Sequence, residues 1–387
     1  MVGLQARPTA IDLFAGAGGL STGFQQAGFD VVAANDSDPY AAATYRLNHP
    51  STLFVGGSIE SITEAEFLGG TGLHRGELDV LVGGPPCQAF SVYNHRRGMH
   101  DERSGLFREY LRMVHGLLPR MVVIENVTGI TSIDGGRAVH DIKDSLRNLG
   151  YHVESAVLKA EEYGVPQERR RIFFVGSRSY LPIRWPTPTY AACENIFTIG
   201  HNLKPLVTVD EAIGDLPTLN NSEGAEKMDY TAAPVSDYQR QSRSGSAWVF
   251  NHVAPQLAPI NLERMKHIPP GGSWRDIPYQ LLPAGMKLAN RSDHTKRYGR
   301  LHPDGQACTI MTRCDVHWGA YIHPYQDRAI TVREAARFQS FPDKFQFLGS
   351  RGEQYKQVGN AVPPLLAAAV ANDVAFMLAE QAVESRA

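Results

Sequence analysis

A single cysteine, Cys87, follows two prolines at the end of an apolar run in the segment DVLVGGPPCQAFS, residues 79–91. The run predicts a buried strand, and the pair Gly83–Gly84 ends it. The prolines fix the backbone and remove two amide donors, so the position of the thiol is constrained. The ligand end of a parallel sheet lies where such strands end. We therefore interpret Cys87 as a candidate nucleophile, with an inert core cysteine as the alternative.

Two further segments carry charged side chains at the ends of predicted strands. Glu125 lies near the end of RMVVIENV, where a carboxylate is costly to bury without a task or a partner. Burial would raise its pKa and let it donate a proton, whereas a helix cap or a structural ion pair is the alternative. In VPQERRRIFFVG, alternation sends Gln167, Arg169 and Arg171 to one face of a strand. A basic edge strand is the alternative there.

The glycines of FAGAGG, residues 14–19, lie between a predicted strand and a predicted helix. They allow a sharp turn and a close approach of backbone to a ligand. Asp36 follows Gly16 by 20 residues, at the end of the next strand, where an acid can bind ribose hydroxyls. The third glycine of a pyrophosphate site is missing, so a nucleoside such as S-adenosylmethionine fits better than a dinucleotide. A structural glycine turn is the alternative.

These segments need a sheet to bring them together, and the chain supplies its elements in alternation. Continuous apolar strands alternate with helices up to residue 180, which predicts a doubly wound, mostly parallel α/β sheet. Residues 196–325 are irregular, and helical patterns return near 329. We predict a catalytic, Rossmann-like domain over 1–190 and 326–387, and a smaller, irregular, β-rich domain over 191–325.

Composition narrows the class of protein. The chain has 387 residues, a net charge of −2 and four cysteines, and its hydrophobic share of 43% is ordinary for a globular protein. The cysteines suggest neither a disulfide framework nor a metal site, and the start lacks the apolar core of a signal peptide. No apolar run reaches the roughly 20 residues that span a bilayer. We expect a cytoplasmic protein. Ten bases and three acids over 240–300 suggest a DNA-facing surface, with accidental clustering as the alternative.

Five motifs occur in an order that resembles the DNA (cytosine-5) methyltransferase family. They are DLFAGAGG, GGPPCQAFS, ENV, QERRR and QVGNAVPP. RAITVREAARFQSFPDKF, residues 328–345, is also similar to the family's stretch before its last motif. The resemblance covers roughly 1–178 and 323–375 and is specific because five motifs keep their order. The region between them is where such enzymes carry their variable target-recognition domain.

The resemblance implies roles for individual residues. Cys87 would add to carbon 6 of a cytosine flipped out of double-stranded DNA, and Glu125 would protonate its ring nitrogen 3. Arg171 and Arg169 match arginines that hold the base and the catalytic loop. Gln88, Ser91 and Arg103 match loop positions that contact DNA. Positions matching the S-adenosylmethionine pocket are Phe14, Gly16, Gly18, Gly19, Asp36, Ser58, Pro85, Leu106 and Asn360.

Two positions depart from the family pattern. Ser37 stands where many members place a large residue against adenine, and Ser58 stands where an Asp commonly contacts the adenine amino group. The resemblance also implies a monomeric modification enzyme of a bacterial restriction-modification system, with a possible companion endonuclease. A nicotinamide dehydrogenase, a tRNA-methylating relative and a catalytically silent DNA-binding regulator are the alternatives. The long basic insertion favours DNA over tRNA.

Overall fold

The computed structural model describes residues 7–86, 105–192, 203–290 and 292–384. The chain packs as two compact units. The first comprises Met1–Lys159, Arg170–Thr187 and Val362–Ala387, and the second comprises Ala160–Arg169 and Pro188–Ala361. Residues 326–361 thus pack with the second unit, although the sequence placed them in the catalytic domain. How the residues pack does not show which of them bind the cofactor or DNA, so the functional domain boundaries at 190 and 326 stay a prediction.

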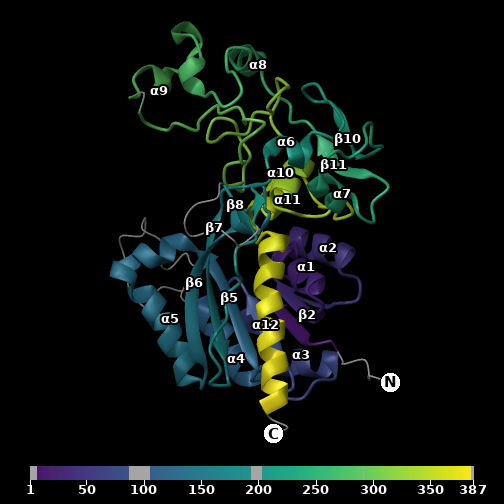
Figure 1. The fold of residues 1–387 in the computed structure, drawn as a ribbon, viewed down its shortest axis with the longest axis vertical. Coiled ribbons are helices and arrows are strands. Elements are labelled where there is room, and N and C mark those ends of the chain that lie inside the picture. Colours follow the sequence, from purple (N-terminus) through teal and green to yellow (C-terminus); the bar gives the residue numbers. More distant parts are fainter. Residues whose placement is uncertain (1–6, 87–104, 193–202, 291, 385–387) are drawn as a thin grey trace. The chain divides into compact units, whose positions relative to one another are not determined.

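The first unit is built on a seven-stranded sheet, which confirms the predicted doubly wound, mostly parallel fold (Figure 1). The strand order is β3-β2-β1-β4-β5-β7-β6, and only β7 runs antiparallel to its neighbours. The strands are β1 (Thr9–Leu13), β2 (Asp30–Asp36), β3 (Leu53–Gly56), β4 (Val80–Gly83), β5 (Met121–Val127), β6 (His152–Lys159) and β7 (Arg170–Ser177).

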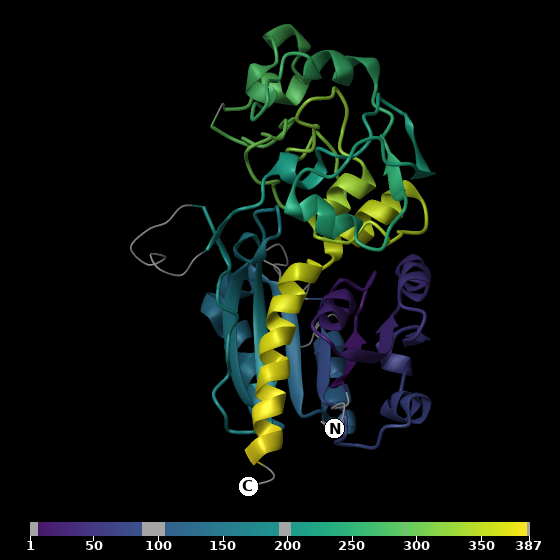
Figure 2. The same ribbon diagram turned by 45° about the vertical axis from the view of Figure 1, so that its right-hand side comes forward.

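Helices cover both faces of this sheet because its strands are apolar on both sides. Alternate strand residues such as Ile11, Leu81 and Val122 share a buried core with α3 (Glu64–Thr71), α4 (Gly105–Leu117) and α5 (Arg137–Asn148). The opposite face carries α1 (Gly19–Gln26), α2 (Pro39–Asn48) and α12 (Pro364–Glu384), the long yellow helix of Figure 2.

The last helix joins the core through a close approach to α1. A Cβ atom at Gly23 would lie 2.4 Å from the Cβ atom of Ala367, so only glycine lets these helices pack at this distance. The segment Arg351–Val383, which includes α12, is long and apolar enough to cross a membrane by length and composition. Its apolar window is 56% buried in the protein, as in the core helix of a folded protein, which passes the same test.

The second unit consists of short helices, two small sheets and long loops. The strand pair β10 (Gly224–Met228) and β11 (Val249–Val253) is antiparallel, and β8 (Tyr190–Ala191) pairs with β9 (Lys204–Pro205). The helices are α6 (Val209–Ile213), α7 (Asp237–Arg243), α8 (Pro259–Met265), α9 (Ala284–Lys287), α10 (Val332–Phe338) and α11 (Arg351–Asn360). Capping boxes begin α6, α7 and α10, which explains why such short helices start at fixed residues.

Candidate active site

The glycine turn after β1 is the sharp turn that the sequence predicted, and it uses left-handed backbone. Gly16 has a φ of +55° and Gly18 a φ of +102°, and Phe14 shares this conformation with a φ of +57°. The Gly16 amide donates a hydrogen bond of 2.8 Å to the Asp36 carboxylate at the end of β2. Gly19 then begins α1. The turn and the acid therefore form one rigid corner at the carboxyl edge of the sheet.

Asp36 is arranged as an acceptor at this corner. Its other oxygen accepts the amide of Asp38 at 2.8 Å. Burial raises the pKa of Asp36 above its usual value, although the amide hydrogen bonds from Asp38 and Gly16 act in the opposite direction. At the end of β3, Ser58 donates to the carboxylate of Glu60 at 3.3 Å. The carboxyl ends of β2 and β3 are thus followed or formed by three polar side chains, which are Asp36, Ser58 and Glu60.

This edge fits a nucleoside cofactor. A Cβ atom at Gly16 or Gly57 would meet no other atom within 4 Å, so both backbones border open space. Pro85 is buried after β4, and the half-buried Leu106 lies at the start of α4. A turn open to backbone contact, an acid for ribose hydroxyls and an apolar side chain are groups that S-adenosylmethionine would use. The contacts themselves remain predictions.

Glu125 and Arg171 form a close ion pair at the same edge. The Arg171 Nε lies 2.7 Å from the Glu125 Oε1, and their side chains are only 13% and 12% exposed. The antiparallel direction of β7 explains this pairing, because it places the amino end of β7 beside the carboxyl end of β5. The ion pair predicted as an alternative is therefore present. It also leaves the carboxylate beside a glycine, 3.1 Å from where a Cβ atom of Gly84 would stand.

A neighbouring asparagine, which the sequence reasoning did not single out, anchors the chain before Cys87. The side-chain amide of Asn126 donates to the carbonyl of Pro85 at 3.1 Å, and its oxygen accepts the amide of Val127 at 2.8 Å. Its place beside Glu125 was the available indication. Cys87, Gln88, Ser91 and Arg103 lie outside the described residues, so their roles stay predictions.

The structure separates the three residues expected on one strand face. Arg171 belongs to the first unit, whereas Gln167 and Arg169 belong to the second. The Arg169 guanidinium is 1% exposed and donates to the carbonyls of Ile310, Gly359 and Ala361 at 3.0, 2.9 and 3.1 Å. Asn360, the exposed last residue of α11, also belongs to the second unit.

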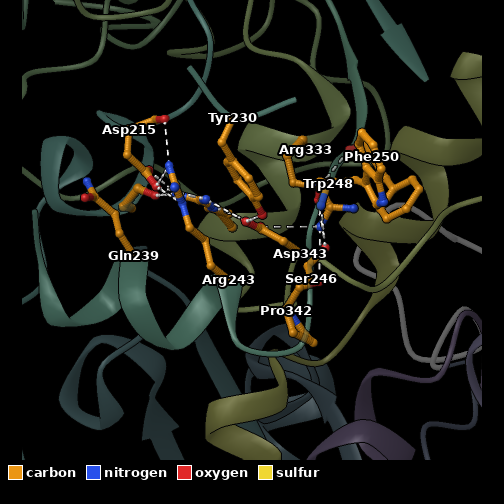
Figure 3. Close-up of polar contacts among 12 residues, drawn as sticks. Asp215, Tyr230, Gln239, Arg243, Ser246, Trp248, Phe250, Arg333, Pro342 and Asp343 are labelled. Atoms are coloured by element: carbon orange, nitrogen blue, oxygen red, sulfur yellow. Dashed lines mark hydrogen bonds and ion pairs between the residues drawn. The ribbon is translucent and has the colours of Figure 1, made fainter. Parts of the chain in front are cut away.

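A buried ionic network holds the second unit together (Figure 3). Arg337 binds Asp343 through hydrogen bonds of 2.6 and 2.9 Å and also binds Asp215. Arg243 donates to Asp215 at 2.6 Å and lies over the ring of Tyr230, which donates to Asp343 at 2.7 Å. Burial raises the pKa of Asp343, but Arg337 outweighs it, so the pKa lies below its usual value.

This network changes the meaning of the basic block over 240–300. Arg243 and Arg300 turn inward, where Arg300 donates to Ile268 and His323 carbonyls at 2.6 and 3.0 Å. Charge counting therefore overstates the surface available to DNA. The exposed face keeps Trp318, which is 61% exposed, with the Arg297 guanidinium 4.5 Å from its ring centroid. Aromatic rings with stacked cations are common at nucleic-acid surfaces.

Comparison with known proteins gives a consistent result. The sequence profile of "C-5 cytosine-specific DNA methylase" matches residues 9–375. The chain is 34% identical to the Type II methyltransferase M.AgeI of Thalassovita gelatinovora, over 94% of this chain and 98% of that protein. It is 35% identical to M.DdeI of Desulfomicrobium norvegicum, over 95% of this chain and 88% of that protein.

Solved structures of known methyltransferases share the fold of this chain. A putative DNA modification methyltransferase encoded within a prophage (E. coli) has a TM-score of 0.74 and 26% identity, covering 96% of this chain and 99% of that one. The S. pombe Dnmt2 methyltransferase, at 18% identity and a TM-score of 0.56, shares the fold and covers 97% and 99% of the two chains. With five motifs in the family's order and a matching profile over residues 9–375, the chain belongs to the C-5 cytosine-specific DNA methylase family and is a DNA (cytosine-5) methyltransferase.

Proposed function

We propose that the protein transfers a methyl group from S-adenosylmethionine to carbon 5 of a cytosine flipped out of a specific double-stranded DNA sequence, through a covalent Cys87 adduct. Its biological role is then that of the modification enzyme of a restriction-modification system. The observation that carries the proposal is the Glu125–Arg171 pair of 2.7 Å, whose carboxylate lies beside Gly84, three residues before Cys87.

The chemistry explains why these residue types are needed together. Carbon 5 of cytosine is a poor nucleophile, but it becomes an enamine carbon once the Cys87 thiolate adds to carbon 6. Glu125 donates a proton to ring nitrogen 3 as the ring accepts electrons, and Arg171 holds that carboxyl group in place. Once carbon 5 has taken up the methyl group, loss of its proton, expulsion of the Cys87 sulfur and return of the nitrogen 3 proton to Glu125 would restore the aromatic ring.

Residues of the first unit would hold the cofactor. The turn at Phe14, Gly16 and Gly18 would contact the cofactor through its backbone. The Asp36 carboxylate would accept hydrogen bonds from the ribose hydroxyls, and Ser58 would contact the adenine. When bound, S-adenosylmethionine supplies a methyl group activated by a positively charged sulfur. Gly19, Pro85 and Leu106 complete the proposed pocket within this unit, and Asn360 of the second unit stays a cofactor contact predicted from the family resemblance.

The second unit would face DNA. Its exposed Trp318 and Arg297 offer a ring and a cation to bases and phosphates. Gln88, Ser91 and Arg103 would contact DNA from the segment that follows Cys87. We further propose a monomeric, cytoplasmic enzyme with a companion endonuclease that acts on the same site.

The central test measures transfer of a tritiated methyl group from S-adenosylmethionine to duplex DNA. The Cys87→Ala variant should transfer none, whereas Cys308→Ala should remain active. Cys308 is a matched control because it is a buried free thiol of the second unit to which the proposed reaction assigns no role. Equal transfer by Cys87→Ala would refute the nucleophile. Transfer of the methyl group to tRNA but not to DNA would refute the proposal that DNA is the substrate.

A second test traps the proposed adduct. With DNA containing 5-fluorocytosine, the ring methylated at carbon 5 cannot release fluorine as it releases a proton. The wild-type protein should therefore form a complex that survives denaturation, in the presence of cofactor only. Absence of this complex under turnover conditions would contradict the covalent step. Bisulfite sequencing of host DNA would identify the modified sequence.

A further inference from the structure

Arg169 lies at the centre of a hydrogen-bonded hub in the second unit. Its guanidinium joins two segments that are far apart in sequence, since it donates to the carbonyl of Ile310 at 3.0 Å and to that of Gly359 at 2.9 Å. A third bond of 3.1 Å reaches the carbonyl of Ala361. These bonds leave two separate nitrogens of a planar guanidinium, Nη1 and Nη2, whereas a lysine ammonium donates from a single nitrogen.

Two glutamines complete this hub. The Gln167 oxygen accepts the Ile310 amide at 2.8 Å, and its nitrogen donates to the Gln339 oxygen at 3.0 Å. Gln339 donates in turn to the carbonyl of Val358 at 2.7 Å. Gln167 and Gln339 are both fully buried, so these bonds are protected from water. We call Gln167, Arg169 and Gln339 the Arg169 hub.

The two segments also touch backbone to backbone. A Cβ atom at Gly359 would lie 2.4 Å from the carbonyl carbon of Met311 and 2.6 Å from the amide of Thr312. No side chain fits between them, so a shift of one segment must displace the other. The hub therefore fixes both with little freedom.

Both segments lead to groups that the proposed function uses. Ile310 directly precedes the loop 311–319, in which Met311 is 53% and Trp318 61% exposed. Gly359 and Ala361 flank Asn360, the position that resembles a cofactor contact. The buried Arg169 guanidinium thus binds both the segment that leads into the loop 311–319, which would contact DNA, and the segment that contains Asn360, which would contact the cofactor.

We propose that Arg169 is a positioning residue, which sets the loop 311–319 and the Asn360 segment as one body and does not contact the target cytosine. This proposal rests on the proposed function for what the two segments contact. It differs from the role that the family resemblance implied for Arg169 together with Arg171, which was to hold the target base and the catalytic loop. Its side chain is already directed to three carbonyls of its own unit, whereas Arg171 carries the contact to Glu125.

Three neighbouring arginines allow a matched experiment. We compare Arg169→Lys, Arg170→Lys and Arg171→Lys, where Arg170 is exposed and serves as the neutral control. Arg169→Lys should raise the KM for DNA and for S-adenosylmethionine about tenfold each, with kcat within about threefold of wild type, because about one net charge-assisted hydrogen bond is lost. Arg171→Lys should instead lower kcat. A kcat loss of about a hundredfold or more in Arg169→Lys with both KM values unchanged would overturn the proposal.

Hydrogen exchange provides a readout that does not need activity. In Arg169→Lys, peptides covering 308–314 and 357–362 should both exchange faster, while β10 and β11 exchange as in wild type. Faster exchange in one peptide alone, in neither, or throughout the second unit would each overturn the proposal. If the wild-type protein transfers no methyl group to DNA, the proposed function fails, and the exchange result still decides whether Arg169 positions both segments.

Discussion

Asp12 provides a quantitative test of the electrostatics beside the glycine turn. It lies on β1 with no exposed surface, and one carboxyl oxygen accepts the amide and hydroxyl of Ser21 at 3.1 and 2.6 Å. The other oxygen has no hydrogen-bond partner in the described part of the chain. Burial, assisted by the nearby Asp36, raises the pKa of Asp12 from 3.8 to about 7, despite the hydrogen bonds from Ser21.

The sign and size of the effect follow from this shift. Between pH 4 and pH 7 the folded protein keeps a proton on Asp12 that the unfolded chain releases, so stability falls as the pH rises through this window. A shift of about three units, at about 1.4 kcal/mol per unit, corresponds to roughly 4 kcal/mol. Asp12→Asn cannot ionise. We therefore expect the wild type to lose about 4 kcal/mol relative to Asp12→Asn between pH 4 and pH 8.

The assay is urea unfolding at several pH values, monitored by tryptophan fluorescence. The difference in unfolding free energy between wild type and Asp12→Asn isolates this carboxyl group, because all other groups titrate in both proteins. Asp30→Asn, at an exposed position that begins β2, is the matched control. Parallel stability curves for wild type and Asp12→Asn would refute the reasoning.

Three further predictions concern the turn, the network and the ion pair. Gly16→Ala should cost about 1–2 kcal/mol of backbone strain and should abolish cofactor binding measured by calorimetry, because its Cβ atom would enter the open space beside the turn. Gly18→Ala should also unfold the protein, because its Cβ atom would lie 2.5 Å from a buried His49 ring atom. Asp343→Asn should destabilise the second unit by about 3–5 kcal/mol in thermal unfolding. Because the pKa of Asp343 is lowered in the folded protein, the stability that its carboxylate provides is lost as the pH falls below about 4. Acid unfolding that is the same in Asp343→Asn as in the wild type would contradict this prediction. Glu125→Gln should lower the single-turnover methyl-transfer rate by about 10²–10⁴ with cofactor affinity unchanged, and a wild-type rate would exclude proton donation.

The repeating part of the fold was predictable from the sequence because apolar strands alternate with helices. The strand predicted in VPQERRRIFFVG corresponds to β7, and the helical patterns that return near residue 329 include α12. The direction of β7 was not predictable, because an apolar run has the same period in either direction. That direction is what places Arg171 beside Glu125.

The grouping of Gln167, Arg169 and Arg171 shows where the period argument stops. Alternation predicted one shared face, but the chain passes from one compact unit to the other between Arg169 and Arg170. Neither glycine nor proline marks this passage in QERRRI. The basic block over 240–300 is a weaker guide than its charge count suggests, for a related reason. Charge counts ignore tertiary partners, and Arg243 and Arg300 find theirs inside the second unit.

The way the chain divides between its units limits how members of this family can exchange specificity. The polypeptide passes between the units four times, after Lys159, Arg169, Thr187 and Ala361. A graft of residues 191–325 alone would cut the second unit and separate Asp215 from Arg337, whose contact crosses the graft boundary. Recombination at 188 and 361 would carry that network whole. If the second unit reads DNA as proposed, the segment to be exchanged is therefore larger than residues 191–325.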